Sequence, residues 1–158
     1  GWKGASSFAT LDAAAIGRSS AERRGLVYVG RASVGMATRS VPPDAWFGGD
    51  VGITRAVLLR AHPLVDDGRL RTAQLGRRLV AASGEVQRWW TSAVGRVGAA
   101  LFVDAVRAGT RLAPGARTDV DAGFGVRFAV PAVSGTFRAD VARGLADGAT
   151  AFSFVYEP

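Results

Sequence analysis

The stretch FGGDVGITRAVLLRAH, residues 47–62, places Arg60 two positions before His62, the only histidine in the chain. It opens on two adjacent glycines, Gly48 and Gly49, and continues through mostly apolar residues. An arginine carries a permanent charge and a planar fork that suits carboxylates, whereas a histidine can transfer a proton or ligate a metal. The other residues of the chain decide which of these chemistries is available.

Nucleophilic and metal chemistry lack their usual partners in this sequence. It contains no cysteine and no second histidine, which excludes disulfides, thiolate sites and multi-histidine metal centres. Its one serine-rich part comprises Ser6, Ser7, Ser19 and Ser20, which do not supply the residue set of a catalytic triad. We therefore expect no enzymatic activity, no metal and no cofactor, and we interpret His62 as a polar contact at the tip of a loop.

The size and composition are typical of one folded domain. The chain has 158 residues, of which 48% are hydrophobic and 21% charged, and this balance excludes a disordered tail. It contains neither the roughly 18 to 20 successive apolar residues of a membrane-spanning helix nor a signal peptide. Because the sequence begins abruptly at Gly1, we expect a fragment from which any upstream domains are missing.

The positive charge does not indicate a nucleic-acid partner. A net charge of +7 could attract nucleic acid or anionic lipid. The arginines are scattered, however, and doublets occur only at Arg23 with Arg24 and at Arg77 with Arg78. Since no basic run interleaved with aromatic residues is present, we expect no nucleic-acid binding.

The strongest regularity is an alternation with a period of two, which is typical of β-strands. Between Asp119 and Val130 the apolar residues fall on one face and the polar or small residues on the other. Similar alternation occurs in segments 28–39, 80–87, 96–105, 136–142 and 150–156, and more weakly in 5–16. These segments predict an all-β fold, an antiparallel meander of about seven strands.

One connection in this meander is much longer than the others. It covers about residues 41–75 and begins with Pro42 and Pro43, which cannot lie in a central strand. A loop of this length inside a compact domain usually has a function. The candidate residues Arg60 and His62 lie within it.

The composition of the two strand faces favours a transmembrane β-barrel. One face is uniformly Val, Ala, Phe and Leu, as a lipid-facing surface requires, and the other mixes small residues with isolated charges, as a lumen would. The aromatic residues Trp46, Trp89, Trp90 and Tyr156 lie near strand ends, where an interfacial belt would place them.

Several motifs, in this order, resemble the C-terminal half of a known family. They are FGG, LRAH, GRRLVAASGEVQRWW, GRVGAALFVDAVRAG, DAGFGVRFAVP and GTFRADVARGLADG, and the resemblance covers most of the chain, roughly Leu26 to Tyr156. The order is similar to that in the bacterial surface antigen family of outer-membrane β-barrels, which includes the BamA assembly factor, its translocation-module relatives and the two-partner-secretion transporters. This resemblance implies a location in the bacterial outer membrane and a role in inserting or translocating other polypeptides. It also implies three kinds of partner: outer-membrane lipid, substrate polypeptides and periplasmic assembly proteins.

The resemblance also implies roles for particular residues. In the family, a long loop enters the barrel lumen and presents an arginine from a valine-arginine-glycine-aromatic motif, which resembles Leu59, Arg60, Ala61 and His62. The family's serine-x-glutamate and phenylalanine-x-aspartate motifs are similar to Ser83 with Glu85 and to Phe102 with Asp104. Taken alone, Arg60 is typical of a solvated loop residue. The resemblance instead predicts a guanidinium within roughly 4 Å of Asp104 or Glu85, because a buried cation needs a carboxylate.

Two other interpretations of the pattern stay open. The chain could form a complete small porin-like or structural barrel, with Val51, Ile53, Arg55 and Val57 in an eighth strand and a ladder between the first and last strands. It could also form a soluble β-sandwich, which requires the apolar face of 120–130 to be buried against a second sheet. Asp140 with Arg138, and Asp121 with Arg127, are interpreted as ordinary lumen charges.

Overall fold

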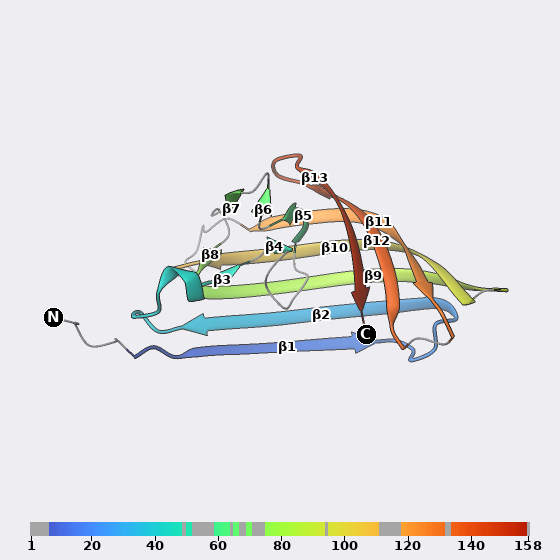
Figure 1. Cartoon of the computed structure of the whole chain (residues 1–158), viewed down its shortest axis with the longest axis horizontal. Coiled ribbons are helices and arrows are strands. Elements are labelled where there is room, and N and C mark those ends of the chain that lie inside the picture. The colour runs from blue at the N-terminus through green and yellow to red at the C-terminus, as the bar shows by residue number, and fades with distance from the viewer. Residues whose placement is uncertain are drawn as a thin grey trace.

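The computed structural model of the chain describes residues 7–48, 50–51, 59–63, 65–66, 69–70, 75–93, 95–110, 118–131 and 134–157. Its main element is a seven-stranded antiparallel sheet in the order β1-β2-β9-β10-β11-β12-β13 (Figure 1). The strands are β1 (Thr10–Arg18), β2 (Gly25–Ala37), β9 (Arg78–Ser92), β10 (Gly95–Gly109), β11 (Asp119–Ala129), β12 (Thr136–Gly144) and β13 (Thr150–Glu157). The predicted all-β meander is confirmed. The first strand begins later than the segment 5–16 predicted for it.

The alternation in the sequence separates the two faces of this sheet as predicted. The side chains of Phe124 and Val126 are 61% and 57% exposed, whereas that of Arg127 is 1% exposed. Val103 and Val141 are also exposed, on the same face. Because side chains alternate across a strand, a shift of one residue in register would exchange the two faces completely.

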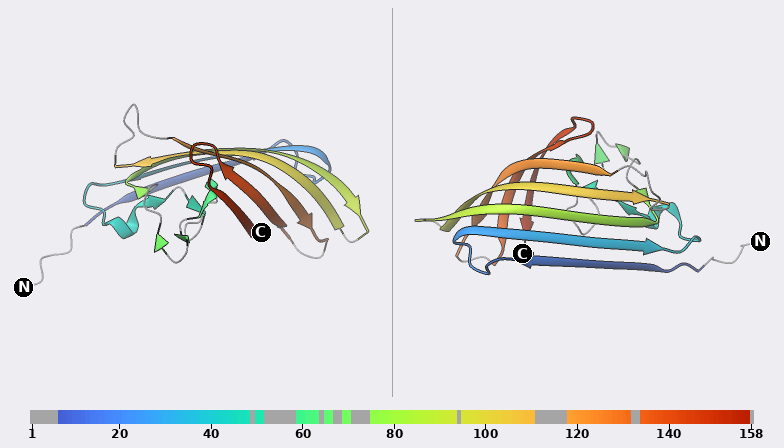
Figure 2. Two further views of the ribbon diagram at one scale, coloured as in Figure 1. Left: turned by 90° about the horizontal axis from the view of Figure 1, so that it is seen from above. Right: turned by 180° about the vertical axis from the view of Figure 1, so that it is seen from behind.

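The sheet is strongly curved, and the chain between β2 and β9 lies under its concave side (Figure 2). This segment begins with the 3-10 helix η1 (Pro43–Ala45) and continues through short strands. They are β3 (Phe47–Gly48), β4 (Asp50–Val51), β5 (Leu59–Pro63), β6 (Val65–Asp66), β7 (Arg69–Leu70) and β8 (Leu75–Gly76). They pair as β3 with β8, β4 with β5 and β6 with β7. We call this segment the concave loop; it corresponds to the long connection predicted at 41–75.

Small apolar clusters attach the concave loop to the sheet. Leu59, which is fully buried, packs with Leu79, Ala81 and Val106. Ala61 packs with Phe102 and Ala142. These contacts place β5 against β9, β10 and β12, so that Arg60, between the two apolar anchors, meets the concave face of the sheet.

The strands β1 and β13 form the two edges of the large sheet. Within the described residues, no ladder joins β1 to β13. The curvature nevertheless brings β13 toward β2, where Arg31 Nη2 lies 3.1 Å from Glu157 Oε1. A cavity of about 730 Å³ opens between these strands and is lined by Ala14, Ala81, Ser33 and Val155, among others.

Neither alternative architecture is visible in the part of the chain that the structure describes. Val51 belongs to β4, which pairs with β5 in the concave loop, while Ile53, Arg55 and Val57 lie outside the described residues. The apolar face of β11 is exposed, so the second sheet that a sandwich requires does not cover it.

Two of the four aromatic residues expected in an interfacial belt are exposed on the convex face. Trp90 and Tyr156 are 50% and 40% exposed on the convex face. Trp89 is 3% exposed and points to the concave side, so its assignment to the belt was wrong. Two adjacent strand residues necessarily face opposite sides, so Trp89 and Trp90 cannot both face outward. Trp46 is partly buried after η1 and donates a hydrogen bond to the Val41 carbonyl oxygen, at 3.3 Å.

Candidate functional site

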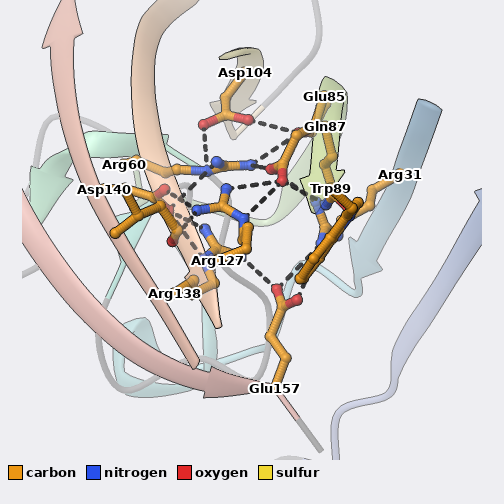
Figure 3. A network of polar contacts seen from close by, with 12 residues as sticks. Arg31, Arg60, Glu85, Gln87, Trp89, Asp104, Arg127, Arg138, Asp140 and Glu157 are labelled. Atoms are coloured by element: carbon orange, nitrogen blue, oxygen red, sulfur yellow. Dashed lines mark hydrogen bonds and ion pairs between the residues drawn. The ribbon is translucent and has the colours of Figure 1, made fainter. Parts of the chain in front are cut away.

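Arg60 is buried against the concave face and surrounded by carboxylates (Figure 3). Its Nη2 lies 3.0 Å from Glu85 Oε2, and its Nε lies 3.1 Å from Asp104 Oδ2. The predicted proximity to Asp104 or Glu85 is therefore confirmed for both acids. Its Nη1 is 3.4 Å from Asp140 Oδ2, so the guanidinium is shared among three carboxylates and does not form a fork with one of them.

Phe102 and Ser83 complete the immediate surroundings of Arg60. In the β9–β10 ladder, Glu85 pairs with Phe102 and Ser83 with Asp104, which places all four side chains in one patch. The Arg60 guanidinium carbon lies 3.7 Å from the centre of the Phe102 ring, a cation–π contact. Ser83 Oγ donates a hydrogen bond to Asp104 Oδ1 at 2.6 Å and so orients that carboxylate.

The charges around Arg60 belong to a larger network across the concave face. Arg127 donates to Glu85 Oε1 from Nε at 2.9 Å and to Asp140 Oδ1 from Nη1 at 2.5 Å. Arg138 Nε donates to Asp140 Oδ2 at 2.9 Å, and its Nη1 pairs with Glu157. The cluster thus joins four arginines and four carboxylates among the described residues: Arg31, Arg60, Arg127, Arg138, Glu85, Asp104, Asp140 and Glu157. We call it the arginine cluster.

Most of this cluster is not predicted from the sequence. Asp140, interpreted as an ordinary lumen charge beside Arg138, is a direct partner of Arg60. Arg127, also interpreted as an ordinary lumen charge, contacts Glu85 and Asp140. The alternation did place these charges on the same face as Glu85, but the register that brings them together is not visible in the sequence.

Gln87 and Trp89 fix the orientation of Glu85. Gln87 Nε2 donates to Glu85 Oε1 at 2.7 Å, and Trp89 Nε1 donates to Gln87 Oε1 at 2.8 Å. This chain of hydrogen bonds runs along the concave side of β9, since the three residues are spaced by two. It holds the carboxylate toward Arg60 and Arg127 and satisfies groups that would otherwise be buried without partners.

Two glycines of β11 make room for the cluster. A Cβ at Gly123 would lie 2.5 Å from Phe102 Cζ, and one at Gly125 would collide with Asp140 Oδ1 and lie 2.8 Å from Arg127 Nη1. Because both positions face the concave side, a larger residue would displace the ring or the ion pairs. Glycine at positions 123 and 125 therefore allows the Phe102 ring and the Arg127–Asp140 ion pair to pack this closely against β11.

His62 has more contacts than a residue at a loop tip. It is 7% exposed, with Nδ1 2.9 Å from Asp121 Oδ1 and Nε2 3.0 Å from Asp147 Oδ2. The interpretation of His62 as a loop-tip contact was wrong, because β5 carries it under the sheet. Asp121 also accepts a hydrogen bond from the backbone N–H of Ala61, at 2.6 Å.

The concave loop compensates an unfavourable pair of like charges in the sheet. Asp104 and Asp121 lie directly opposite each other in the β10–β11 ladder, where two carboxylates repel. Arg60 neutralises Asp104, while Ala61 and His62 bind Asp121. The sheet and the loop are thus electrostatically complementary at three consecutive loop residues.

The glycines at the start of the stretch lie at the base of the loop. Gly48 is buried in β3 and pairs with Leu75 of β8. Gly49 lies outside the described residues. The β3–β8 ladder therefore closes the concave loop near the ends of β2 and β9.

Comparison with protein-family models finds no matching family, and comparison with curated proteins finds no match. Within the described part of the chain, no helix is long and apolar enough to cross a membrane. Nor do the histidine and acidic residues of that part form a group of three or more that could hold a metal ion.

The physical effect of the arginine cluster is to fix the position of the loop. Buried ion pairs contribute little net stability relative to apolar packing, because both partners lose hydration. Removing one partner is unfavourable, however, because the other charge stays buried without compensation. In the observed placement of β5, Arg60 contacts carboxylates from β9, β10 and β12, so a displaced β5 would leave these three acids with one cation fewer.

Proposed function

We propose that this chain is part of an outer-membrane β-barrel that mediates the insertion or translocation of other polypeptides. The observation that carries the proposal is the buried Arg60 of the concave loop, held by Glu85 and Asp104 on a sheet whose outer face is apolar. These are the loop and strand residues through which the sequence resembles the bacterial surface antigen family.

The convex face supports a bilayer as the surrounding medium. Exposed large apolar side chains occur on the convex side of every strand of the sheet, including Leu11, Tyr28, Val86, Leu101, Phe124, Val141 and Phe154. A continuous apolar surface of this extent is unfavourable in water and usually marks contact with a membrane or a protein. The charges of the arginine cluster lie on the opposite face, as a barrel with a polar lumen requires, and the convex-face residues Arg78, Arg88, Arg107 and Arg143 lie toward strand ends.

The proposed mechanism is binding and gating without a chemical step. The unpaired N–H and C=O groups along an edge such as β13 can pair with an incoming strand, which supplies affinity through backbone hydrogen bonds. The arginine cluster ties β9, β10, β11 and β12 together through their side chains. The cluster contacts the edge strand β13 at Glu157, the last residue of that strand, so movement would concentrate along the rest of this edge, where a substrate polypeptide would enter.

The bilayer part of the proposal is tested with the adjacent tryptophans of β9. Variants retaining only Trp89 or only Trp90 are refolded in vesicles containing brominated lipid, and fluorescence quenching is measured. We expect quenching of Trp90, which is 50% exposed, and little quenching of Trp89, which is 3% exposed. Equal quenching of both, or of neither, would contradict a lipid-facing convex surface.

The transport part is tested in the full-length protein that contains this chain. The protein is reconstituted in vesicles, and the folding rate of a reporter outer-membrane barrel and the release of a translocated reporter polypeptide are measured. We expect the wild-type protein to raise at least one of these rates above that of empty vesicles. The Arg60→Lys variant should give only part of this increase, because lysine lacks the planar fork. Passage of small solutes with neither activity would favour the small porin-like barrel instead.

A further inference from the structure

His62 lies between two carboxylates that come from different parts of the sheet. Asp121, fully buried, extends from β11, and Asp147, with a side chain 37% exposed, extends from the turn between β12 and β13. One ring nitrogen lies 2.9 Å from the first carboxylate and the other 3.0 Å from the second. The imidazole therefore connects β5, β11 and the β12–β13 turn at a single point.

These two contacts restrict the protonation state of the ring. A neutral imidazole has one N–H donor and one bare nitrogen, whereas an ionised carboxylate only accepts hydrogen bonds. A bare nitrogen facing a carboxylate oxygen at 3.0 Å would be repulsive. Both contacts are attractive at once only when the ring carries two protons, or when one carboxylate is itself protonated.

The charges around His62 favour the imidazolium. The groups facing it are Asp121 from β11 and Asp147 from the turn, while Asp104 on β10 is compensated by Arg60 on β5 itself. Asp119 lies on the same face of β11 two residues away, and the guanidinium of Arg143 lies near Gly148 in the turn. Burial alone would lower the pKa of His62, but its hydrogen bond to Asp147 and its contact with the Asp121 carboxylate outweigh this effect and raise the pKa above its ordinary value of 6.5.

Close packing around the ring leaves little room for another arrangement. A Cβ at Gly144, where β12 ends, would lie 2.8 Å from His62 Cε1. In the same turn, the backbone N–H of Gly148 donates to the Gly144 carbonyl oxygen at 3.0 Å, and that of Gly144 donates to the Ala149 carbonyl oxygen at 2.8 Å. The ring thus lies directly against the turn that leads into the edge strand β13.

We propose that His62 is a proton-dependent latch between the concave loop and the β12–β13 hairpin. When the ring carries both protons it joins Asp121 to Asp147 and holds the turn to the loop. When it loses a proton, one of the two contacts becomes repulsive and the turn is released. Arg60 stays charged at all physiological pH values, so the loop itself remains attached while the hairpin loosens.

The latch acts on the edge of the sheet. β13 has a ladder partner on one side only in the described sheet, and the turn at Asp147 joins it to β12. Release of the turn would loosen the turn end of the hairpin, while Arg138 and Asp140 on β12 and Glu157 on β13 remain held by the arginine cluster. This inference depends on the contacts of His62 and not on the proposed transport function, so it can hold or fail independently of that function.

The first test observes the His62 ring directly, and its main result comes from the wild-type protein. Because the chain has one histidine, its two imidazole ¹⁵N signals in the refolded, ¹⁵N-histidine-labelled protein are unambiguous. We expect both nitrogens to carry protons at pH 6.5 and the midpoint to lie above this value. Asp147→Asn should move the midpoint down, while Asp12→Asn, on exposed β1, should leave it unchanged. A ring with one bare nitrogen at pH 6.5 would overturn the latch, and so would a protonated Asp121 or Asp147 carboxyl paired with a neutral ring.

The second test measures the turn. Hydrogen exchange of the Gly144 and Gly148 amides is compared between wild type and His62→Gln at each pH, so that the intrinsic pH dependence of exchange cancels. At low pH we expect the turn amides to exchange more slowly in wild type than in His62→Gln, by a factor of about ten for each unit by which the pKa of His62 is raised. Above the midpoint, the ratio of the two exchange rates should approach one. A ratio that is the same at every pH would overturn the proposal. Amides in the β9–β10 ladder should not differ between the two proteins at any pH.

Discussion

The two faces of the large sheet reverse the usual distribution of charge and apolar surface. On the concave face, Arg127, Arg138 and Asp140 are each 1% exposed, whereas on the convex face Phe124 is 61% exposed. Water-soluble proteins bury apolar side chains and almost never bury charges unless they are paired. The concave face is therefore organised by electrostatic pairing, and the convex face exposes large apolar side chains, as the proposed bilayer environment requires.

The two faces should therefore respond differently to substitution. On the concave face, the charges of the arginine cluster contact one another. This face should therefore be sensitive to the loss of a single charge and to added volume. The convex face makes few contacts within the chain, so it should tolerate changes of size and respond mainly to a new charge.

The largest effect is expected from a single charge removed from the concave face. Arg60→Met leaves Glu85, Asp104 and Asp140 with one cation fewer, and we expect a loss of about 3–5 kcal/mol of unfolding free energy. Adding Asp104→Asn should recover part of this loss, because it restores the charge balance. Equilibrium unfolding in urea from detergent micelles provides the measurement, with the exposed arginine variant Arg39→Met as the control. Additive losses from the two substitutions would contradict the assignment of Asp104 as the partner of Arg60.

A charge added to the convex face should have the next largest effect. Val126→Arg, near the middle of β11, should destabilise the protein in a bilayer by about 2–4 kcal/mol, while Leu145→Arg, beyond the end of β12, should lose about 0–1 kcal/mol. The comparison is made by unfolding from vesicles. The two positions are expected at different depths in the bilayer, so their losses of stability should differ. Equal losses at both positions would be inconsistent with a bilayer around the convex face.

The sequence predicts the faces of the sheet well because alternation is a local property. The face on which a strand residue lies follows from the residues next to it in the sequence. Asp104, Glu85 and Arg127 could therefore be assigned to the polar face of their strands without knowledge of the strand pairing. The same rule separates Trp89 from Trp90, and their assignment together to a belt failed because it relied on composition alone.

The sequence predicts contacts across the sheet poorly because they depend on register and curvature. The link from Arg60 to Glu85 and Asp104 could be inferred only through a resemblance to known motifs. Asp140 lies on a strand two positions away from β10, and it reaches Arg60 because the sheet is curved and the loop lies beneath it. The partners of His62 were equally inaccessible, since Asp147 lies in a turn where alternation carries no information.

A smaller effect is expected from added volume on the concave face. Gly125→Ala introduces a Cβ that collides with Asp140 Oδ1 and the carbonyl oxygen of Ala139, and we expect a loss of about 1–3 kcal/mol from overpacking. Gly30→Ala is a matched control in β2, because nothing lies within 4 Å of the added carbon. Urea unfolding of the two variants should give clearly different midpoints. Identical midpoints would mean that the cluster rearranges freely, which contradicts its role in fixing the loop.

The smallest effect should be a pH dependence of stability that comes from His62 and Asp147, which lie outside the long strands. The raised pKa of His62 means that its contribution is fully present below its ordinary pKa of 6.5 and is lost as the pH rises through the raised value. The hydrogen bond from His62 lowers the pKa of Asp147, so that contribution is present above the ordinary value of 3.8 and is lost as the pH falls through the lowered one. The pair should therefore stabilise the protein most between pH 3.8 and 6.5. Melting temperatures of wild type and His62→Gln should differ most in this interval and converge at higher pH, whereas a difference that grows with rising pH would show that the neutral ring is the form that holds the turn.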